Sequence, residues 1–221
     1  MFVLGIDPGL SRCGYGCVQK VRGELVAVAA GVIVTSPSEP LEERLVTLYH
    51  ELGKLVKELA PDTVVVERVL FQTNARTAMS VGQASGLALV AAVEAGCSVA
   101  QYSANEVKQA VVGYGGATKA QVQHMVTRLL SLDEEPQPPD VADALALAFC
   151  HLTTQPLHES VRRAISGQSR RTQGQSVLKP PAERRSIAPS VRSNASGGTG
   201  THDRAGLFRV QGADAAEVPG E

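Results

Sequence analysis

Residues 2–9 read FVLGIDPG and decide how the fold begins. The apolar run before Asp7 predicts a buried strand, and Pro8 and Gly9 then force the chain to turn. The strand therefore ends with the carboxylate of Asp7 at its rim. An Asp-Pro-Gly turn with no further role is the alternative interpretation of this residue.

A second strand that ends in a carboxylate is predicted at Val64–Val66. Three β-branched residues in a row are typical of a fully buried strand, and Glu67 follows them directly. The sequence thus predicts a second acidic residue at the end of a strand. A solvated strand end is the alternative for Glu67.

Two further acids stand at the predicted start of an apolar helix. Pro138 and Pro139 favour a helix start. A spacing of three residues puts Asp140 and Asp143 on the same helix face. The alternatives are a helix cap at Asp140 and, at Asp143, an exposed acid that interacts favourably with the helix dipole.

The four acids together predict a metal site built from Asp7, Glu67, Asp140 and Asp143. Carboxylate oxygens suit hard cations such as Mg²⁺ and Mn²⁺. Without a cation, the same carboxylates would repel one another and their pKa values would rise. Two ions held about 3.5–4 Å apart stabilise both the attacking and the leaving oxygen of a phosphoryl displacement. We therefore expect a two-metal nuclease that uses two Mg²⁺ ions, with Mn²⁺ as a substitute.

The first half of the chain also predicts a hairpin and two helical regions. Strands are expected at Tyr15–Gln19 and Glu24–Val34, with a turn near Arg22 and Gly23. Leucines at helical spacing then predict a helix that ends before Pro61. Residues 75–94 are rich in Gly, Ala and Ser, so helices can approach closely there. Core packing and a dimer surface are both open for that region.

Two capping boxes predict the helices that follow. Ser103 with Glu106, and Thr118 with Gln121, each match the pattern. The loop between these helices matches neither a Walker loop nor a dinucleotide motif, so no nucleotide site is predicted. Lys108 precedes the loop and Lys119 follows it, which favours contacts with phosphate. Solvated surface lysines are the alternative.

Several blocks, in order from residue 1 to about 153, resemble the RuvC family of Holliday junction resolvases. The blocks are Gly5-Ile6-Asp7-Pro8-Gly9, Val66-Glu67-Arg68-Val69, Val107-Lys108-Gln109, Gln121-Val122-Gln123-His124-Met125-Val126 and Ala142-Asp143-Ala144-Leu145-Ala146. The resemblance implies an α/β chain with the RNase H-like fold, in which helices flank a mixed central sheet. It also implies a homodimer that nicks four-way DNA junctions symmetrically, leaves 5′-phosphate and 3′-hydroxyl ends, and works with RuvA and RuvB.

The resemblance also assigns roles to individual residues. Lys108 and Lys119 match lysines that contact DNA or support catalysis, and Lys119 is expected to offset charge on the scissile phosphate. The family often carries an aromatic wedge three positions after the strand-end glutamate, where this chain has Leu70 and then Phe71. Phe71 is therefore the expected base-stacking residue, with core packing as the alternative. Arg76 flanks Phe71 and is expected to touch phosphate, with a merely solvated loop residue as the alternative. His124 is excluded from the catalytic set, because a histidine on a helix is more often structural.

Composition changes after about Leu157, which predicts a nuclease domain at residues 1–156 and a disordered tail at 157–221. The first 157 residues carry 11 Lys and Arg against 16 Asp and Glu, and the remainder carries 10 against 6. The basic tail contains the pairs Arg162-Arg163, Arg170-Arg171 and Arg184-Arg185. We expect these pairs to add sequence-independent DNA affinity, and a solubilising tail without a binding role is the alternative.

The rest of the composition points to a cytoplasmic protein. The four cysteines form no Cys-x-x-Cys motif, so free thiols are expected. The longest apolar stretch is interrupted by Glu94 and Gly96, so no membrane span is expected. Two other functions stay open: a phosphotransferase of the actin and sugar-kinase class, and a non-catalytic junction-binding or RNA-processing protein with the same fold.

Overall fold

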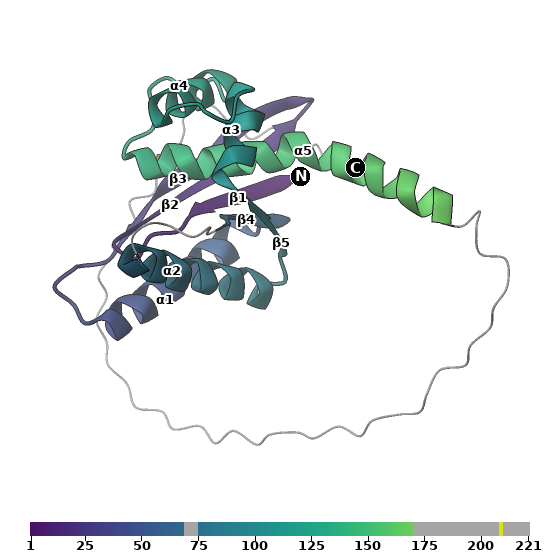
Figure 1. The fold of residues 1–221 in the computed structure, drawn as a ribbon. Helices are drawn as coiled ribbons and strands as arrows, with labels where there is room; N and C mark the ends of the chain where they lie inside the picture. Colours follow the sequence, from purple (N-terminus) through teal and green to yellow (C-terminus); the bar gives the residue numbers. More distant parts are fainter. Residues whose placement is uncertain (69–74, 170–207, 210–221) are drawn as a thin grey trace, which may run out of the picture. The chain divides into compact units, whose positions relative to one another are not determined.

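The structure is a computed structural model, and it describes residues 1–68, 75–169 and 208–209 (Figure 1). Its strands are β1 (Phe2–Asp7), β2 (Arg12–Val21), β3 (Glu24–Val34), β4 (Thr63–Glu67), β5 (Ser98–Tyr102) and β6 (Phe208–Arg209). Its helices are α1 (Leu41–Leu59), α2 (Ala75–Glu94), α3 (Ala104–Val112), α4 (Lys119–Leu129) and α5 (Pro139–Ser169).

The chain divides into two compact units, residues 1–156 with 204–221 and residues 157–203. The first unit contains the sheet and all four acidic residues of the predicted site. Of the second unit, the structure describes residues 157–169, which are the last part of α5.

The length of α5 corrects one expectation. The sequence predicts a disordered tail from residue 157, whereas the helix continues to Ser169. The physical reason is the spacing of apolar residues, which recur every four positions at Leu157, Val161 and Ile165 and so favour a helix. The overall composition of the segment does not reveal this spacing. The remaining tail residues, 170–207 and 210–221, lie outside the described part of the chain.

The sheet is mixed, with the strand order β5-β4-β1-β2-β3-β6. The strand β4 pairs in parallel with both β1 and β5, whereas β1, β2 and β3 pair antiparallel in sequence. Arg22 and Gly23 form the turn between β2 and β3 with φ angles of 51° and 98°. Positive φ at both positions suits the twist of a tight hairpin, and this turn was predicted.

Helices cover both faces of the sheet (Figure 1). One core lies between the sheet and α3, α4 and α5, and it includes Val3 and Val65. The other core lies between the sheet and the helices α1 and α2, and it includes Leu4 and Ile6. Because neighbouring strand residues point to opposite faces, the short apolar strands supply side chains to both cores. The expected mixed sheet flanked by helices is confirmed.

Three glycines let α5 lie directly on the sheet. A Cβ atom at Gly5 would stand 2.0 Å from the carbonyl oxygen of Ala144, and one at Gly14 would stand 2.1 Å from that of Asp140. A Cβ atom at Gly16 would stand 2.7 Å from the side chain of Leu145 and 2.9 Å from its backbone nitrogen. Only residues without a side chain allow the helix backbone to come this close. The start of α5 is therefore fixed against β1 and β2.

Most of the other predicted elements are confirmed. Both capping boxes form, with Ser103 accepting from the backbone of Glu106 and Thr118 accepting from that of Gln121. The strand β5 was not predicted, because its residues lie at the end of a long apolar stretch and Gly96 separates it from α2 by a short turn. Only Tyr102 of this strand is buried, and its sequence, SVAQY, does not alternate apolar and polar residues.

Candidate active site

Asp7 and Glu67 lie side by side at the carboxyl ends of two neighbouring strands, and this end of the sheet is called its edge below. The strands β1 and β4 pair in parallel up to Ile6 and Val66, so the next residue of each strand is the acid. Parallel neighbours are about 4.8 Å apart. Ile6 and Val66 both face α1 and α2, so the two acids that follow them point toward the opposite face, where α5 packs.

The first turn of α5 brings Asp140 and Asp143 to this edge. Asp7 pairs with Gly14 across β1 and β2. The carbonyl of Asp140 lies directly over Gly14. Helix packing on the glycines therefore places the two helix acids above the end of β1. The structure brings together all four acids that the sequence singles out.

The electrostatics of the edge confirm that the four acids are close to one another. Burial raises the pKa of Asp7 from 3.8 to about 7, and the charges of Asp143, Glu67 and Asp140 add to the rise. Burial also raises the pKa of Glu67, with a further contribution from Asp143, whereas Lys119 and Lys108 lower it. The other carboxylates and two lysines thus lie near enough to Asp7 or Glu67 to change the pKa values of these two acids.

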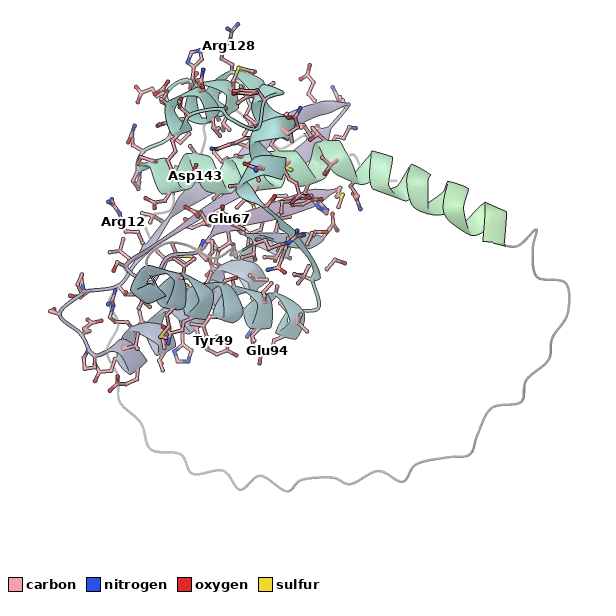
Figure 2. The ribbon with its side chains drawn as sticks, viewed as in Figure 1. Arg12, Tyr49, Glu67, Glu94, Arg128 and Asp143 are labelled. Atoms are coloured by element: carbon pink, nitrogen blue, oxygen red, sulfur yellow. The ribbon has the colours of Figure 1, made fainter. Side chains whose placement is uncertain are left out.

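Two cations pair with the helix acids. Lys119 Nζ donates a hydrogen bond of 3.0 Å to Asp143 Oδ2. This hydrogen bond raises the pKa of Lys119. Arg12 Nε lies 4.0 Å from Asp140 Oδ2. Figure 2 shows Arg12, Glu67 and Asp143 in the same part of the molecule.

The carboxylates fit a hard cation by their chemistry, although the side chains are not arranged as a finished ligand set. Among the described residues, no three Asp, Glu, His or Cys groups stand ready to hold one ion. In this arrangement Asp143 pairs with Lys119 at 3.0 Å and Asp140 lies 4.0 Å from Arg12. An all-oxygen set around a buried carboxylate whose pKa is about 7 still favours a hard divalent ion.

The raised pKa of Asp7 makes the stability of the metal-free protein depend on pH. Between its usual pKa of 3.8 and about 7, folded Asp7 holds a proton that the unfolded chain has lost. Unfolding free energy therefore falls as pH rises through this window. Thermal melts in EDTA should show a lower midpoint at pH 8 than at pH 5, and Asp7→Asn should flatten this part of the profile. An equal slope in wild type and variant would contradict the assignment.

Of the other predicted site residues, one lies near the acids and the side chains of the rest are outside the described part of the chain. Lys108 lies on α3 near enough to Glu67 to lower its pKa. Arg76 belongs to α2, but its side chain is outside the described part, and Leu70 and Phe71 lie outside the described residues altogether. The base wedge therefore stays a prediction. His124 Nδ1 lies 3.5 Å from Glu135 Oε1, and its exclusion from the catalytic set stays a prediction.

A polar network holds the turn that follows Asp7. Thr35 Oγ1 donates to the carbonyl of Leu10 at 2.6 Å, and the backbone N–H of Thr35 donates to the carbonyl of Ser11 at 3.2 Å. Arg44 on α1 donates to Thr35 Oγ1 at 3.0 Å and to Ser11 Oγ at 2.6 Å. The buried hydroxyl and the arginine thus fix residues 10 and 11 to the end of β3.

Sequence reasoning missed Arg12 and the three glycines on which α5 packs. The register of the hairpin would have located Arg12, because the start of β2 and the end of β1 lie at the same edge. Gly5, Gly14 and Gly16 alternate along two paired strands, a pattern that indicates close approach of another backbone.

All four cysteines are free thiols, as expected. No helix in the described ranges has the length and apolar character needed to cross a bilayer.

Comparisons with known proteins agree with this geometry. The family model described as "Crossover junction endodeoxyribonuclease RuvC" matches residues 3–151. The protein of that name from Salinispora arenicola is 53% identical over 153 residues, which are 69% of this chain and 87% of that protein. The one from Moorella thermoacetica is 47% identical over 156 residues, 71% of this chain and 93% of that protein.

A solved structure matches the fold as well. The RuvC of Thermus thermophilus in complex with Holliday junction substrate is 38% identical, with a TM-score of 0.67. The match covers 72% of this chain and 96% of that one. The mixed sheet and its two helical layers are thus the RNase H-like arrangement that the sequence predicts. The chain belongs to the RuvC family of crossover junction endodeoxyribonucleases.

Proposed function

We propose that the protein resolves four-way DNA junctions in homologous recombination and DNA repair by hydrolysing the DNA backbone at its acidic edge. The acidic edge consists of Asp7, Glu67, Asp140 and Asp143. The observation that carries this proposal is the gathering of four carboxylates around the end of β1, in a chain of this family. A similar protein has been solved with Holliday junction substrate, which supports the same substrate class here. The family assignment favours a nuclease over the phosphotransferase alternative.

The family is one of metal-dependent nucleases. Two Mg²⁺ ions are proposed as the cofactor, with Mn²⁺ as a substitute, and Asp7, Glu67, Asp140 and Asp143 as their ligands. When bound, such a pair activates a water and stabilises the departing 3′ oxygen. Asp7 is central to this set, because burial and the charges of the other three carboxylates all raise its pKa.

The residues around the acids have separate roles. Lys119 pairs with Asp143 before DNA arrives and then offsets the charge of the scissile phosphate. Lys108 lies close enough to Glu67 to reach a neighbouring phosphate. Arg76 and the base wedge Phe71 complete the proposed DNA contacts, on the strength of the family resemblance. The products carry 5′-phosphate and 3′-hydroxyl ends and can be resealed by ligase.

A homodimer is proposed through the outer face of α2. Ala84, Ala88 and Ala91 are buried against the core, which confirms core packing for one side of the helix. The opposite side carries a stripe at helical spacing, made of the exposed residues Met79, Gly82, Val90 and Val93 and the half-buried Gly86. Met79 is 68% exposed and Val93 is 65% exposed. Exposed apolar residues flanking small ones suit a close helix contact between two copies.

Two further assignments are proposed. Coupling to the branch-migration proteins RuvA and RuvB is proposed because the chain belongs to the RuvC family. A cytoplasmic location is proposed because DNA is the substrate and the thiols are free.

The basic tail is proposed to add sequence-independent DNA affinity. The family model matches residues 3–151, and the arginine pairs lie beyond that range. A chain that ends at Leu157 should bind junctions more weakly at low salt and show a shallower dependence of affinity on salt. Fluorescence anisotropy with full-length and shortened protein measures both quantities. Equal affinity at low salt would refute the role of the tail.

Cleavage of alternative substrates tests the proposed function. The protein should nick a mobile four-way DNA junction in Mg²⁺ and leave linear duplex, single-stranded DNA and an RNA four-way junction uncut. EDTA should abolish nicking. Binding without cutting would identify a junction-binding module, and cleavage of the RNA junction alone would identify an RNA-processing relative.

A further inference from the structure

Arg12 stands at the same end of the strands as the acids and lies beside Asp140, but no role in DNA binding has been assigned to it so far. It is the first residue of β2, and its partner in β3 is Val34. Its side chain is 58% exposed, and its Nε lies 4.0 Å from Asp140 Oδ2. Figure 2 shows the side chain reaching outward on the side of the molecule where Glu67 and Asp143 lie.

The backbone under Arg12 is fixed although the side chain is exposed. Arg44 and Thr35 hold the preceding residue, Ser11, through a side-chain hydrogen bond of 2.6 Å and a backbone hydrogen bond of 3.2 Å. A Cβ atom at Gly9 would stand 2.1 Å from the carbonyl oxygen of Arg12, so the turn is also tightly closed on this side. The guanidinium is therefore presented from a rigid base, which lowers the entropy lost when it binds a ligand.

The ion pair with Asp140 is easily exchanged. It lies at the long end of the range for salt bridges and joins groups that are 58% and 30% exposed. Exposed pairs of this kind contribute roughly 0–1 kcal/mol. A divalent cation on Asp140 would compete directly with the guanidinium for that carboxylate. Arginine retains several planar donors that match phosphate oxygens.

We propose that Arg12 is a phosphate-binding residue for the DNA strand at the acidic edge, held by Asp140 in the metal-free site and released when Asp140 binds a cation. This inference rests on the proposed function. It predicts that Arg12 matters more for DNA binding when a divalent cation is present than when it is absent. Lys119 lies 3.0 Å from Asp143, so each of the two helix acids has a cationic side chain beside it.

Junction binding with and without a divalent cation tests this. Affinity is measured by anisotropy in Ca²⁺ and in EDTA, with a denaturing gel to verify that the junction stays uncut. Arg12→Ala should weaken binding about tenfold in Ca²⁺ and clearly less in EDTA. The slope of log affinity against log salt in Ca²⁺ should fall by about 0.9, the value for one lost phosphate contact. Arg12→Lys should retain most of the slope.

Arg128→Ala is the matched control. Arg128 is an exposed arginine in the last turn of α4, and Figure 2 shows it projecting away from Asp143. Its loss should change neither affinity nor slope. Equal effects of Arg12→Ala and Arg128→Ala would overturn the proposal. The proposal would also be overturned if Arg12→Ala bound Ca²⁺ more tightly and kept its junction affinity, since Arg12 would then only balance the charge of Asp140. Failure of wild-type protein to bind junctions would instead overturn the proposed function.

Discussion

Asp7→Asn is expected to lower the rate of junction cleavage by about a thousandfold or more while junction affinity changes by less than about twofold. The substitution keeps the shape of the side chain and removes one ligand charge from the centre of the acidic group. The DNA-binding surface does not change. Single-turnover cleavage and anisotropy on the same junction measure the two quantities separately.

The same substitution should stabilise the metal-free protein at neutral pH. Burial and three neighbouring carboxylates raise the pKa of Asp7 to about 7, so the ionised form is unfavourable in the fold. Asp133→Asn is the control, because Asp133 is an exposed acid in the loop before α5 and its loss should alter neither cleavage nor stability. If Asp7→Asn retained cleavage, Asp7 would not be one of the metal ligands.

Gly14→Ala should have the second largest effect, although alanine is chemically inert. Its Cβ would stand 2.1 Å from the carbonyl oxygen of Asp140 and 2.5 Å from the carbonyl carbon, so the first turn of α5 must move. Overpacking of this kind costs about 1–3 kcal/mol of stability. Displacing the helix acids by about 1 Å should lower the cleavage rate on the order of a hundredfold. Thermal melts and single-turnover cleavage measure both effects.

Gly53→Ala is the control for this experiment. Gly53 lies within α1, and a Cβ there would meet nothing within 4 Å. Alanine favours a helix over glycine, so this variant should be slightly more stable and fully active. If Gly14→Ala were as active and as stable as Gly53→Ala, the close seating of α5 would not position the acids.

Local patterns were enough to predict the elements that carry the acids. The apolar run before Asp7 and the β-branched run before Glu67 are strands, and the two prolines before Asp140 mark the start of a helix. Both capping boxes formed because their side chains satisfy backbone groups within four residues. Such interactions are local and can be derived without knowing the fold.

Properties that depend on packing between distant segments could not be derived in the same way. The seating of α5 on Gly5 and Gly14 joins residues more than 120 positions apart, and it decides where Asp140 and Asp143 lie. The pairing of Arg12 with Asp140 follows from that seating. Strand β5 was missed because its sequence does not alternate apolar and polar residues.

The most direct test of the central claim is to map the nicks on a mobile four-way DNA junction. Each strand is labelled in turn, and the reaction is run in Mg²⁺ with wild-type protein and with Asp7→Asn. The account predicts paired nicks at symmetric positions on two opposing strands, with ends that DNA ligase reseals, and none with the variant. Unpaired nicks at unrelated positions, or nicks that persist in Asp7→Asn, would contradict it.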